Sequence, residues 1–369
     1  MQLTPVEEKN DAPVMGKETG VSGPDKKQWP ADGLENVLNC PVCGSRQRQL
    51  PYTALTDQVF NCAPGQWDLY RCENCASAYL DPRPTPASIG LAYTEYYTHT
   101  PISGGKPEAD SWWRRWRVSQ RNAFLNKHYG YHLKPALDFS LFMSQRRQRR
   151  FDRYTGYLRF PGPGARLLDV GCGNGSFLLQ MQSLGWEVCG IDADLRAVEQ
   201  AQKAGLNVRV ELSPQGLWPQ GHFDAICMSH VIEHLHNPLQ TLADCKNLLK
   251  PGGQLMIATP NFDACGREYF GSDWRGLEIP RHLVLFTEKS LWRAMEQSGF
   301  VVARPDRPNL NAKAMFKMSG ELRRKRRGRS DVSKWRLRWL AFKADLATKR
   351  DPGRTEELIL LGTTVNAPG

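Results

Sequence analysis

The second half of the chain alternates between short apolar runs and longer amphipathic stretches. The apolar runs, which include ARLLDVGC and FDAICMS, lie at 165–172, 186–193, 206–212, 223–229 and 253–260. Helix-forming stretches such as DLRAVEQAQKAG and PLQTLADCKNLLK stand between them, and TEKSLWRAMEQSGF, VVARPD and EELILLGTT add one helix and two strands. Strands that alternate with helices in this way predict an α/β fold, with a parallel sheet and helices on both of its faces.

The first 160 residues follow a different pattern. Residues 1–35 are polar and lack the apolar stretch of a secretory signal, so we predict a disordered lead-in. Residues 36–84 hold short strand-like runs among paired cysteines, and 85–160 form an aromatic and basic segment that we predict to be helical up to the FPGPG break. The α/β region then covers 161–369, with a basic insertion at 311–352.

Two C-x-x-C pairs stand 28 residues apart in the N-terminal region and comprise Cys40, Cys43, Cys72 and Cys75. Four thiolates at this spacing predict a tetrahedral zinc site in a zinc ribbon, and this zinc would be structural because the protein fills all four positions. Gly44 suits the left-handed turn that such a knuckle often needs, whereas Ala76 occupies the matching place in the second pair. Two unrelated pairs or a redox C-x-x-C are the alternatives.

The composition indicates a soluble protein of a reducing compartment. The chain is 40% hydrophobic and 24% charged, and no apolar run approaches the roughly 18–20 residues of a membrane span. Ten cysteines without a secretory signal favour thiols or metal ligands over a disulfide framework. We therefore expect a cytoplasmic protein.

The net charge of +11 is concentrated in two segments. Residues 111–160 carry ten Arg and two Lys against two acids, and residues 321–350 carry eight Arg and four Lys against three. In the second segment, apolar residues recur near helical spacing among the cations, at Trp335, Trp339, Phe342 and Leu346. Such a helix suits an anionic membrane surface and a peripheral position at the inner face of the membrane. A solvated charge run with a few core-facing aromatics is the alternative.

The segment LLDVGCGNGSF follows a predicted strand and opens a predicted helix. Its glycines have the spacing G-x-G-x-G, Asp169 stands two residues ahead of them, and Asp192 ends the next strand. Glycines at such a turn let a nucleotide approach the backbone, and an acid at the end of the second strand accepts hydrogen bonds from ribose hydroxyls. A dinucleotide fingerprint would need a third glycine where Ser176 stands, so the pattern differs from that fingerprint.

With these motifs the chain resembles the class I S-adenosylmethionine-dependent methyltransferases from about Ala165 to its end. LLDVGCGNGSF, VCGIDAD, FDAICMSHVIEHLHNP, LLKPGGQLMIATPN and PRHLVLFTEKSLWRAMEQSGF stand in the order of that family's motifs. The resemblance implies a Rossmann-like sheet that is parallel with a reversed last strand, and S-adenosylmethionine as the cofactor.

The resemblance also implies which residues bind the cofactor. Asp169, Gly171 and Gly173 would line the methionine portion, and Gly175 would permit close packing of the helix. Asp192 would bind the ribose and Met228 would lie near the adenine. The full implied set is Asp169, Gly171, Cys172, Gly173, Gly175, Asp192, Ala193 and Met228.

The segment MSHVIEHLHNP contains the spacing H-x-x-E-H, formed by His230, Glu233 and His234. A zinc hydrolase would carry such ligands within a long helix, but Asn237-Pro238 interrupts the segment almost at once. In the methyltransferases that this chain resembles, Glu-His after the fourth strand helps to hold the site together. Some ubiquinone-pathway O-methyltransferases bind a divalent ion at a similar Glu-x-x-Glu-His, so metal binding stays an alternative.

A hydroxyl acceptor needs a base to take its proton. His282, in RHLVLF, resembles a histidine with this role in zinc-ribbon sugar methyltransferases, although Arg281 replaces the Glu of the deoxysugar C-methylating enzymes. We therefore predict His282 as the catalytic base, with Glu233 and His234 in the same site. Tyr96 and Tyr97 could close over the acceptor or pack in the interior.

The ribbon, the Glu-His pair and RHLVLFT together resemble methyltransferases of bacterial surface polysaccharides and deoxysugars. We predict O-methylation of a small-molecule, glycan or lipid-linked acceptor. The alternative is an RNA methyltransferase, such as one acting on rRNA, in which the basic segments bind the phosphate backbone. Nucleic acid is the less favoured partner, because the chain lacks both the Asn/Asp-Pro-Pro-aromatic signature and the Pro-Cys nucleophile of many base methylators.

Overall fold

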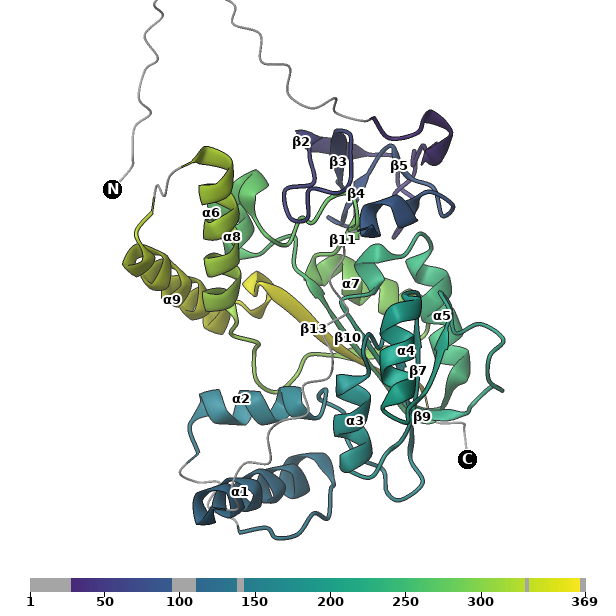
Figure 1. The fold of residues 1–369 in the computed structure, drawn as a ribbon, viewed down its shortest axis with the longest axis vertical. Helices are drawn as coiled ribbons and strands as arrows, with labels where there is room; N and C mark the ends of the chain where they lie inside the picture. Colours follow the sequence, from purple (N-terminus) through teal and green to yellow (C-terminus); the bar gives the residue numbers. More distant parts are fainter. Residues whose placement is uncertain (1–27, 95–110, 138–142, 329–331, 366–369) are drawn as a thin grey trace, which may run out of the picture.

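The computed structural model describes residues 28–94, 111–137, 143–328 and 332–365 (Figure 1). Its centre is a seven-stranded sheet in the order β12-β13-β10-β9-β6-β7-β8. The strands are β6 (Arg166–Val170), β7 (Glu187–Asp192), β8 (Asn207–Val210), β9 (Phe223–Ser229), β10 (Leu249–Pro260), β12 (Val301–Ala303) and β13 (Glu357–Thr363). Strand β13 is antiparallel to both of its neighbours, and the other pairs are parallel. The predicted parallel sheet with a reversed last strand is confirmed.

Helices cover both faces of this sheet, as the alternation of strands and helices predicts. They are α3 (Ser176–Ser183), α4 (Leu195–Lys203), α5 (Pro238–Leu248), α6 (Cys265–Phe270) and α7 (Glu288–Gln297). Successive strand residues enter different apolar clusters: Leu168 and Ile226 pack with α5 and α7, whereas Leu167 and Cys227 pack with α3. Because strand side chains alternate between faces, such all-apolar runs belong to strands that are buried on both sides.

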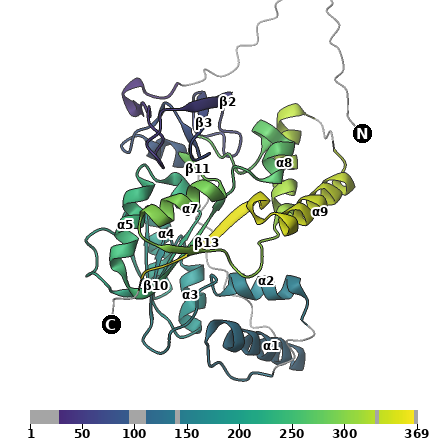
Figure 2. The same cartoon turned by 180° about the vertical axis from the view of Figure 1, so that it is seen from behind.

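Four further helices lie on one side of the sheet, to the left in Figure 1 and to the right in Figure 2. They are α1 (Trp112–Tyr129), α2 (Gln145–Tyr154), α8 (Ala312–Arg327) and α9 (Lys334–Arg350). Helices α1 and α2 complete the cluster that contains α3, through Phe124 and Phe151. Helices α8 and α9 form the basic insertion between β12 and β13, and η6 (Pro352–Arg354) leads from α9 into β13.

The N-terminal region forms a small antiparallel sheet that extends into the α/β region. Its strands are β2 (Arg48–Leu55), β3 (Trp67–Cys72), β4 (Ala78–Leu80) and β11 (Val284–Leu285), in the order β11-β4-β3-β2. Three of these strands come from the ribbon, but β11 follows directly on His282 in the chain. The strand that begins two residues after the predicted catalytic histidine therefore belongs to the same hydrogen-bonded sheet as the ribbon.

The structure differs from the predicted lead-in at residues 28–35. Here η1 (Ala31–Gly33) is followed by β1 (Leu34–Glu35), which pairs with β5 (Arg83–Pro84). Trp29 is buried, its ring meets that of Trp67 edge to face at 5.1 Å, and its indole N–H donates to the Gly33 carbonyl. A single buried tryptophan anchors a segment whose polar composition alone predicted disorder.

Candidate active site

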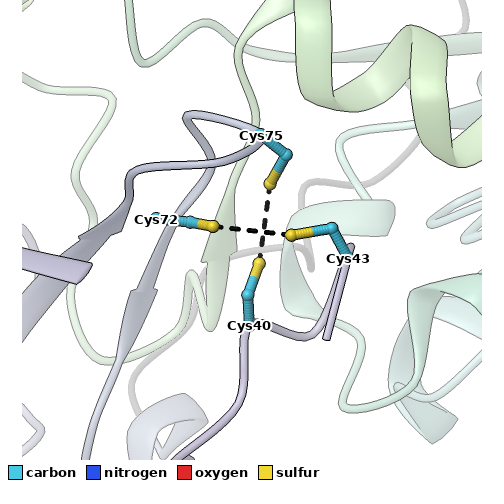
Figure 3. A group of neighbouring side chains, drawn as sticks. All are labelled: Cys40, Cys43, Cys72 and Cys75. Carbon is cyan, nitrogen blue, oxygen red and sulfur yellow. Dashed lines mark hydrogen bonds between the residues drawn. The ribbon is translucent and has the colours of Figure 1, made fainter. Parts of the chain in front are cut away.

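The four paired cysteines converge on one point, as Figure 3 shows. The Sγ atoms of Cys40 and Cys75 are 3.6 Å apart, and those of Cys43 and Cys72 are 3.5 Å apart. Thiolates 2.3 Å from a tetrahedral zinc would be about 3.8 Å from one another. The arrangement therefore fits a structural zinc ion with four protein ligands and no open position.

The two cysteine knuckles have the same backbone geometry despite different residues. Gly44 and Ala76 both have positive φ, at 73° and 66°, and their N–H groups donate to the carbonyls of Cys40 and Cys72. A left-handed alanine costs roughly 1 kcal/mol or more relative to glycine. The second knuckle thus keeps the same turn at an energetic cost, as expected where four ligands must meet.

The glycine loop after β6 passes close to the segment that follows β9. Gly171 has a φ of 76°, and a Cβ placed on it would come within 2.2 Å of Val231 Cγ2. A Cβ on Gly175 would come within 2.3 Å of Leu206, whereas one on Gly173 would meet nothing within 4 Å. Gly171 and Gly175 therefore serve close packing, and the backbone at Gly173 is open on the side where a ligand can approach.

Two acidic side chains face each other at this loop. Asp192 accepts hydrogen bonds from the N–H groups of Gly173 and Asp194, at 2.7 and 2.9 Å. Asp169 is buried, and burial together with the charge of Asp192 raises the pKa of its carboxyl to about 8. A cationic ligand would relieve this repulsion, and S-adenosylmethionine carries both a sulfonium and an ammonium group. The acids therefore fit the predicted cofactor.

The other predicted cofactor residues surround the same loop. Met228 is fully buried in β9 and pairs in register with Val170, the last residue of β6. Cys172 is buried, while Ala193 is exposed directly after Asp192. All eight predicted residues lie at or beside the carboxyl ends of β6, β7 and β9, where open α/β sheets bind ligands. Their contacts with the cofactor stay predictions.

The segment after β9 turns sharply at His230, which has a φ of 57°. Its Nε2 lies 2.7 Å from Glu357 Oε1 and its Nδ1 lies 3.4 Å from Glu233 Oε1. Partial burial lowers the pKa of His230, but the two carboxylates outweigh it and raise this pKa to about 10. His230 is therefore an imidazolium directed toward Glu357.

Glu233, in η4 (Ile232–His234), is fully buried and stays ionised. Burial alone would raise its pKa, but the attraction of His230 and of the neighbouring histidines lowers the pKa to about 2. Its Oε2 accepts a hydrogen bond from Thr259 Oγ1 at 2.8 Å. Its Oε1 has no well-oriented donor among the described residues, and His282 Nε2 lies 3.9 Å from it.

His234 and His282 stand edge to face, with ring centroids 4.7 Å apart. His234 Nδ1 donates to the Arg281 carbonyl at 3.0 Å, and His282 Nδ1 donates to the Gly276 carbonyl at 2.9 Å. Because a carbonyl oxygen can only accept, Nδ1 carries the proton in the neutral form of each ring, and Nε2 is then the nitrogen with the lone pair. Burial, followed by the charge of His234, lowers the pKa of His282 to about 4, so its ring is neutral at pH 7.

Glu233, His234 and His282 thus form one cluster, and the Tyr93 hydroxyl lies 3.1 Å from His234 Nδ1 at its border. One ligand atom each of Glu233, His234 and His282 lies within 4.8 Å of the others. Such a set can hold a divalent ion or receive the proton of an acceptor hydroxyl. The H-x-x-E-H spacing predicted a group of His230, Glu233 and His234. In the structure the third member of the group is His282, and His230 Nε2 contacts Glu357 instead.

A buried ion pair fixes His282 from the ribbon side. The Arg281 guanidinium is fully buried and lies 2.7 Å from Asp57 Oδ1 and 3.1 Å from Asp57 Oδ2. The same carboxylate accepts backbone N–H groups of four ribbon residues, Val59, Phe60, Cys62 and Ala63. The ribbon therefore holds the residue that precedes His282 and whose carbonyl orients His234.

The sequence reasoning did not identify Asp57, Thr259 or Glu357 as parts of the site. Thr259 stands at the carboxyl end of a predicted strand, a position where polar side chains often line a ligand site. Asp57 carries no such signal, because its partner Arg281 is distant in the chain. Tyr96 and Tyr97 lie outside the described residues.

Comparisons with known proteins identify a methyltransferase domain in this chain. A family model described as a methyltransferase domain matches residues 142–304. The ubiquinone biosynthesis O-methyltransferase of Dinoroseobacter shibae is 32% identical over 170 residues, which cover 40% of this chain and 68% of that protein. The one of Caulobacter vibrioides is 37% identical over 130 residues, which cover 32% of this chain and 50% of that protein. The matched region thus spans about half to two thirds of these relatives.

Among solved structures, a SAM-dependent methyltransferase from Archaeoglobus fulgidus has a TM-score of 0.40 at 18% identity, over 65% of this chain and 98% of that one. This likeness is too low to add to the assignment. The family match, the curated relatives and the sheet order are sufficient for it. The chain belongs to the class I S-adenosylmethionine-dependent methyltransferases. The relatives named here are O-methyltransferases of ubiquinone biosynthesis, and their names do not support the predicted resemblance to polysaccharide enzymes.

Proposed function

We propose that this protein methylates a hydroxyl group of a small acceptor, which is a sugar, a glycan unit or a lipid-linked metabolite. The observation that carries the proposal is the neutral, buried His282, whose Nε2 lies 3.9 Å from Glu233 Oε1 in the cluster that also contains His234. The names of the relatives support oxygen as the methylated atom. The resemblance of RHLVLFT to sugar methyltransferases is the reason for a sugar acceptor, and the basic segments are the reason for a lipid-linked one.

Bound S-adenosylmethionine supplies an electrophilic methyl group at its sulfonium. The chain has to orient the acceptor hydroxyl in line with that methyl group and to remove its proton. In our proposal His282 Nε2 takes this proton, and the ionised Glu233, 3.9 Å away, stabilises the imidazolium that forms. The Gly276 carbonyl, which accepts from Nδ1, keeps the ring in the required tautomer.

The pKa of His282 gives this proposal a pH signature. A base must be unprotonated to act, and the pKa of about 4 leaves His282 unprotonated throughout the neutral range. We expect kcat to stay level from neutral pH downward and to fall only as the pH approaches about 4. A falling limb near pH 6.5, the ordinary value for histidine, would contradict a buried neutral base.

A second role for the same three residues is supported by the cluster that they form. Glu233, His234 and His282 together offer two imidazoles and a carboxylate to a divalent ion. In that case Glu233, His234 and His282 would hold the ion, which would supply a positive charge for the acceptor oxygen, and His282 would be a ligand rather than the base. Dialysis against a weak chelator, under conditions in which metal analysis still finds the ribbon zinc, followed by addition of magnesium or manganese, separates the two roles: activity that survives this dialysis excludes the ion.

We also propose that the four cysteines hold one structural zinc ion. The convergent sulfur atoms and the paired left-handed turns support it. Metal analysis of the purified protein should find one zinc per chain, and a Cys72→Ser variant should lose it. Zinc that is retained by the Cys72→Ser variant would contradict this assignment.

The described part of the chain has no helix that is long and apolar enough to cross a membrane. The acceptor class is tested by incubating the protein with methyl-labelled S-adenosylmethionine and a lysate divided into lipid, glycan, RNA and small-molecule fractions. Label in the lipid, glycan or small-molecule fraction supports the proposal. Label confined to RNA would overturn it and favour the RNA methyltransferase alternative.

A further inference from the structure

Helix α9 has two apolar faces on opposite sides. Its inner face packs on the protein through Ala341, Ala344 and Thr348, which are buried. The outer face carries large apolar side chains with exposed fractions of 75%, 44%, 63% and 38%, at Trp335, Trp339, Phe342 and Leu346. At 3.6 residues per turn these four side chains fall within about 60° of one another around the helix axis. We call them the outer stripe.

Cations border the outer stripe on both sides. All six Lys and Arg residues of the helix are exposed, namely Lys334, Arg336, Arg338, Lys343, Lys349 and Arg350. Lys343 Nζ lies 3.8 Å from the centre of the Trp339 ring, so the cation and the stripe are in contact. The one acid of the helix, Asp345, is turned inward and accepts the Ala312 N–H. The outer face is therefore apolar at its centre and positive at its edges.

The neighbouring helices α8 and α2 lie on the same side of the molecule as α9 (Figures 1 and 2). Exposed Arg324 and Lys325 lie in the last turn of α8, which packs against α9. Arg149 of α2 lies near enough to Asp345 to lower its pKa, although burial raises that pKa overall. Exposed cations are thus carried by α8 as well as by α9, and α2 comes close to the inner side of α9.

These helices are also connected to the residues around His230. Glu357, which holds His230, accepts a hydrogen bond from Asn309 at 2.6 Å and forms an ion pair with Arg153 of α2. Asn309 stands just before α8, whose first N–H is the donor to Asp345 of α9. A surface that receives α9 would therefore lie near the edge of the active site.

We propose that the outer stripe of α9 docks on the surface of an anionic phospholipid bilayer, with the helix lying in the membrane plane. An exposed apolar stripe bordered by Lys and Arg is the arrangement by which an interfacial helix buries its apolar side chains among the lipids while its cations meet phosphate groups. A second copy of the chain that docked through the same helix would place its six cations against the six of the first copy, and like charges repel. An RNA strand would stack on the aromatic rings but would leave Leu346 without a partner.

This inference stands apart from the methyl-transfer chemistry, and it gives a lipid-linked acceptor a route to the site. The test is co-sedimentation of the full chain with vesicles of phosphatidylcholine alone and with vesicles that also contain phosphatidylglycerol. We expect binding to the phosphatidylglycerol vesicles only, and binding that weakens as the salt concentration rises. A Trp335→Ser/Phe342→Ser variant should bind about tenfold more weakly, and Arg338→Gln about fivefold more weakly.

Val301→Ser is the matched control, because Val301 is 59% exposed on β12 and lies outside the insertion. It should bind vesicles as the unaltered protein does. The altered side chains are exposed, so the unfolding temperature of each variant should stay unchanged, and this is measured alongside. Absence of binding to the anionic vesicles, or equal losses in the Val301→Ser control, would overturn the proposal. Binding to single-stranded RNA that exceeds vesicle binding and is lost in the Trp335→Ser/Phe342→Ser variant would also overturn it.

Discussion

The buried ion pair between Asp57 and Arg281 gives the most specific prediction about how the ribbon supports the site. Replacing Asp57 with alanine removes both contacts to the guanidinium, at 2.7 and 3.1 Å, and the acceptor of four backbone N–H groups. The Arg281 side chain is fully buried, so its charge cannot turn to water without a change in the packing. We expect Asp57→Ala to destabilise the fold and to disturb His282.

The size of the effect depends on the contacts that Arg281 keeps in the Asp57→Ala variant. Removing one partner of a buried ion pair costs about 3–5 kcal/mol. Glu278 still lies 3.3 Å from Arg281 Nε and the Ala92 carbonyl still accepts a hydrogen bond from Nη1, so we expect the lower end of this range. At about 2–4 °C per kcal/mol, a loss of about 3 kcal/mol lowers the unfolding temperature by about 6–12 °C.

The assay is thermal unfolding followed by fluorescence, with cofactor binding measured by calorimetry on the same samples. Asp68→Ala is the control, because Asp68 also lies in the ribbon but accepts an exposed N–H from Ala54. The double variant Asp57→Ala/Arg281→Met should be more stable than Asp57→Ala alone, because no buried charge is left unpaired. An Asp57→Ala protein that melts within 2 °C of the unaltered protein, a margin of about 1 kcal/mol, would refute the reasoning.

Four further predictions concern the ribbon and the cofactor loop. Removal of zinc by a chelator should lower the unfolding temperature and abolish methyl transfer, because β4 pairs with the strand after His282; full activity of the zinc-free protein would contradict this. Affinity for S-adenosylmethionine should rise as the pH rises through about 8, because a cation binds best to ionised Asp169, and a flat titration would contradict it. Without cofactor, Asp169 should make the fold less stable as the pH rises from about 4 to 8, because the folded state keeps the proton over that window. Gly171→Ala should weaken cofactor binding more than Gly164→Ala, since both have positive φ but only a Cβ on Gly171 would overlap Val231; equal effects of the two variants in calorimetry would remove the packing argument.

The sequence predicted those features that repeat within a short stretch of chain. The sheet and its helices follow from the alternation of apolar runs, and the cofactor loop follows from glycine spacing next to Asp169. The two cysteine pairs likewise predicted the convergence that the structure shows. Each of these patterns lies within a short stretch of chain, so it can be recognised without knowing which distant residues it contacts.

Features that depend on distant contacts could not be predicted in this way. His282 completes the group around Glu233 because β11 joins the ribbon sheet, and the spacing of H-x-x-E-H instead pointed to His230. Asp57 lies in a ribbon loop with no motif, and only the fold brings it to Arg281. The sequence showed the helical spacing of the apolar residues on the outer face of α9. It did not show that the opposite face packs the helix on the protein and leaves the outer face exposed.

The central claim, methyl transfer from S-adenosylmethionine at the site of Glu233, His234 and His282, is tested most directly by comparing His282→Ala with the unaltered protein. Transfer of labelled methyl groups to the responsive lysate fraction and cofactor affinity are measured on the same two samples. We predict that transfer falls by about 100-fold or more, the contribution expected of a general base, while cofactor affinity changes little. Unchanged transfer by His282→Ala, or no transfer by the unaltered protein to any fraction, would contradict the claim.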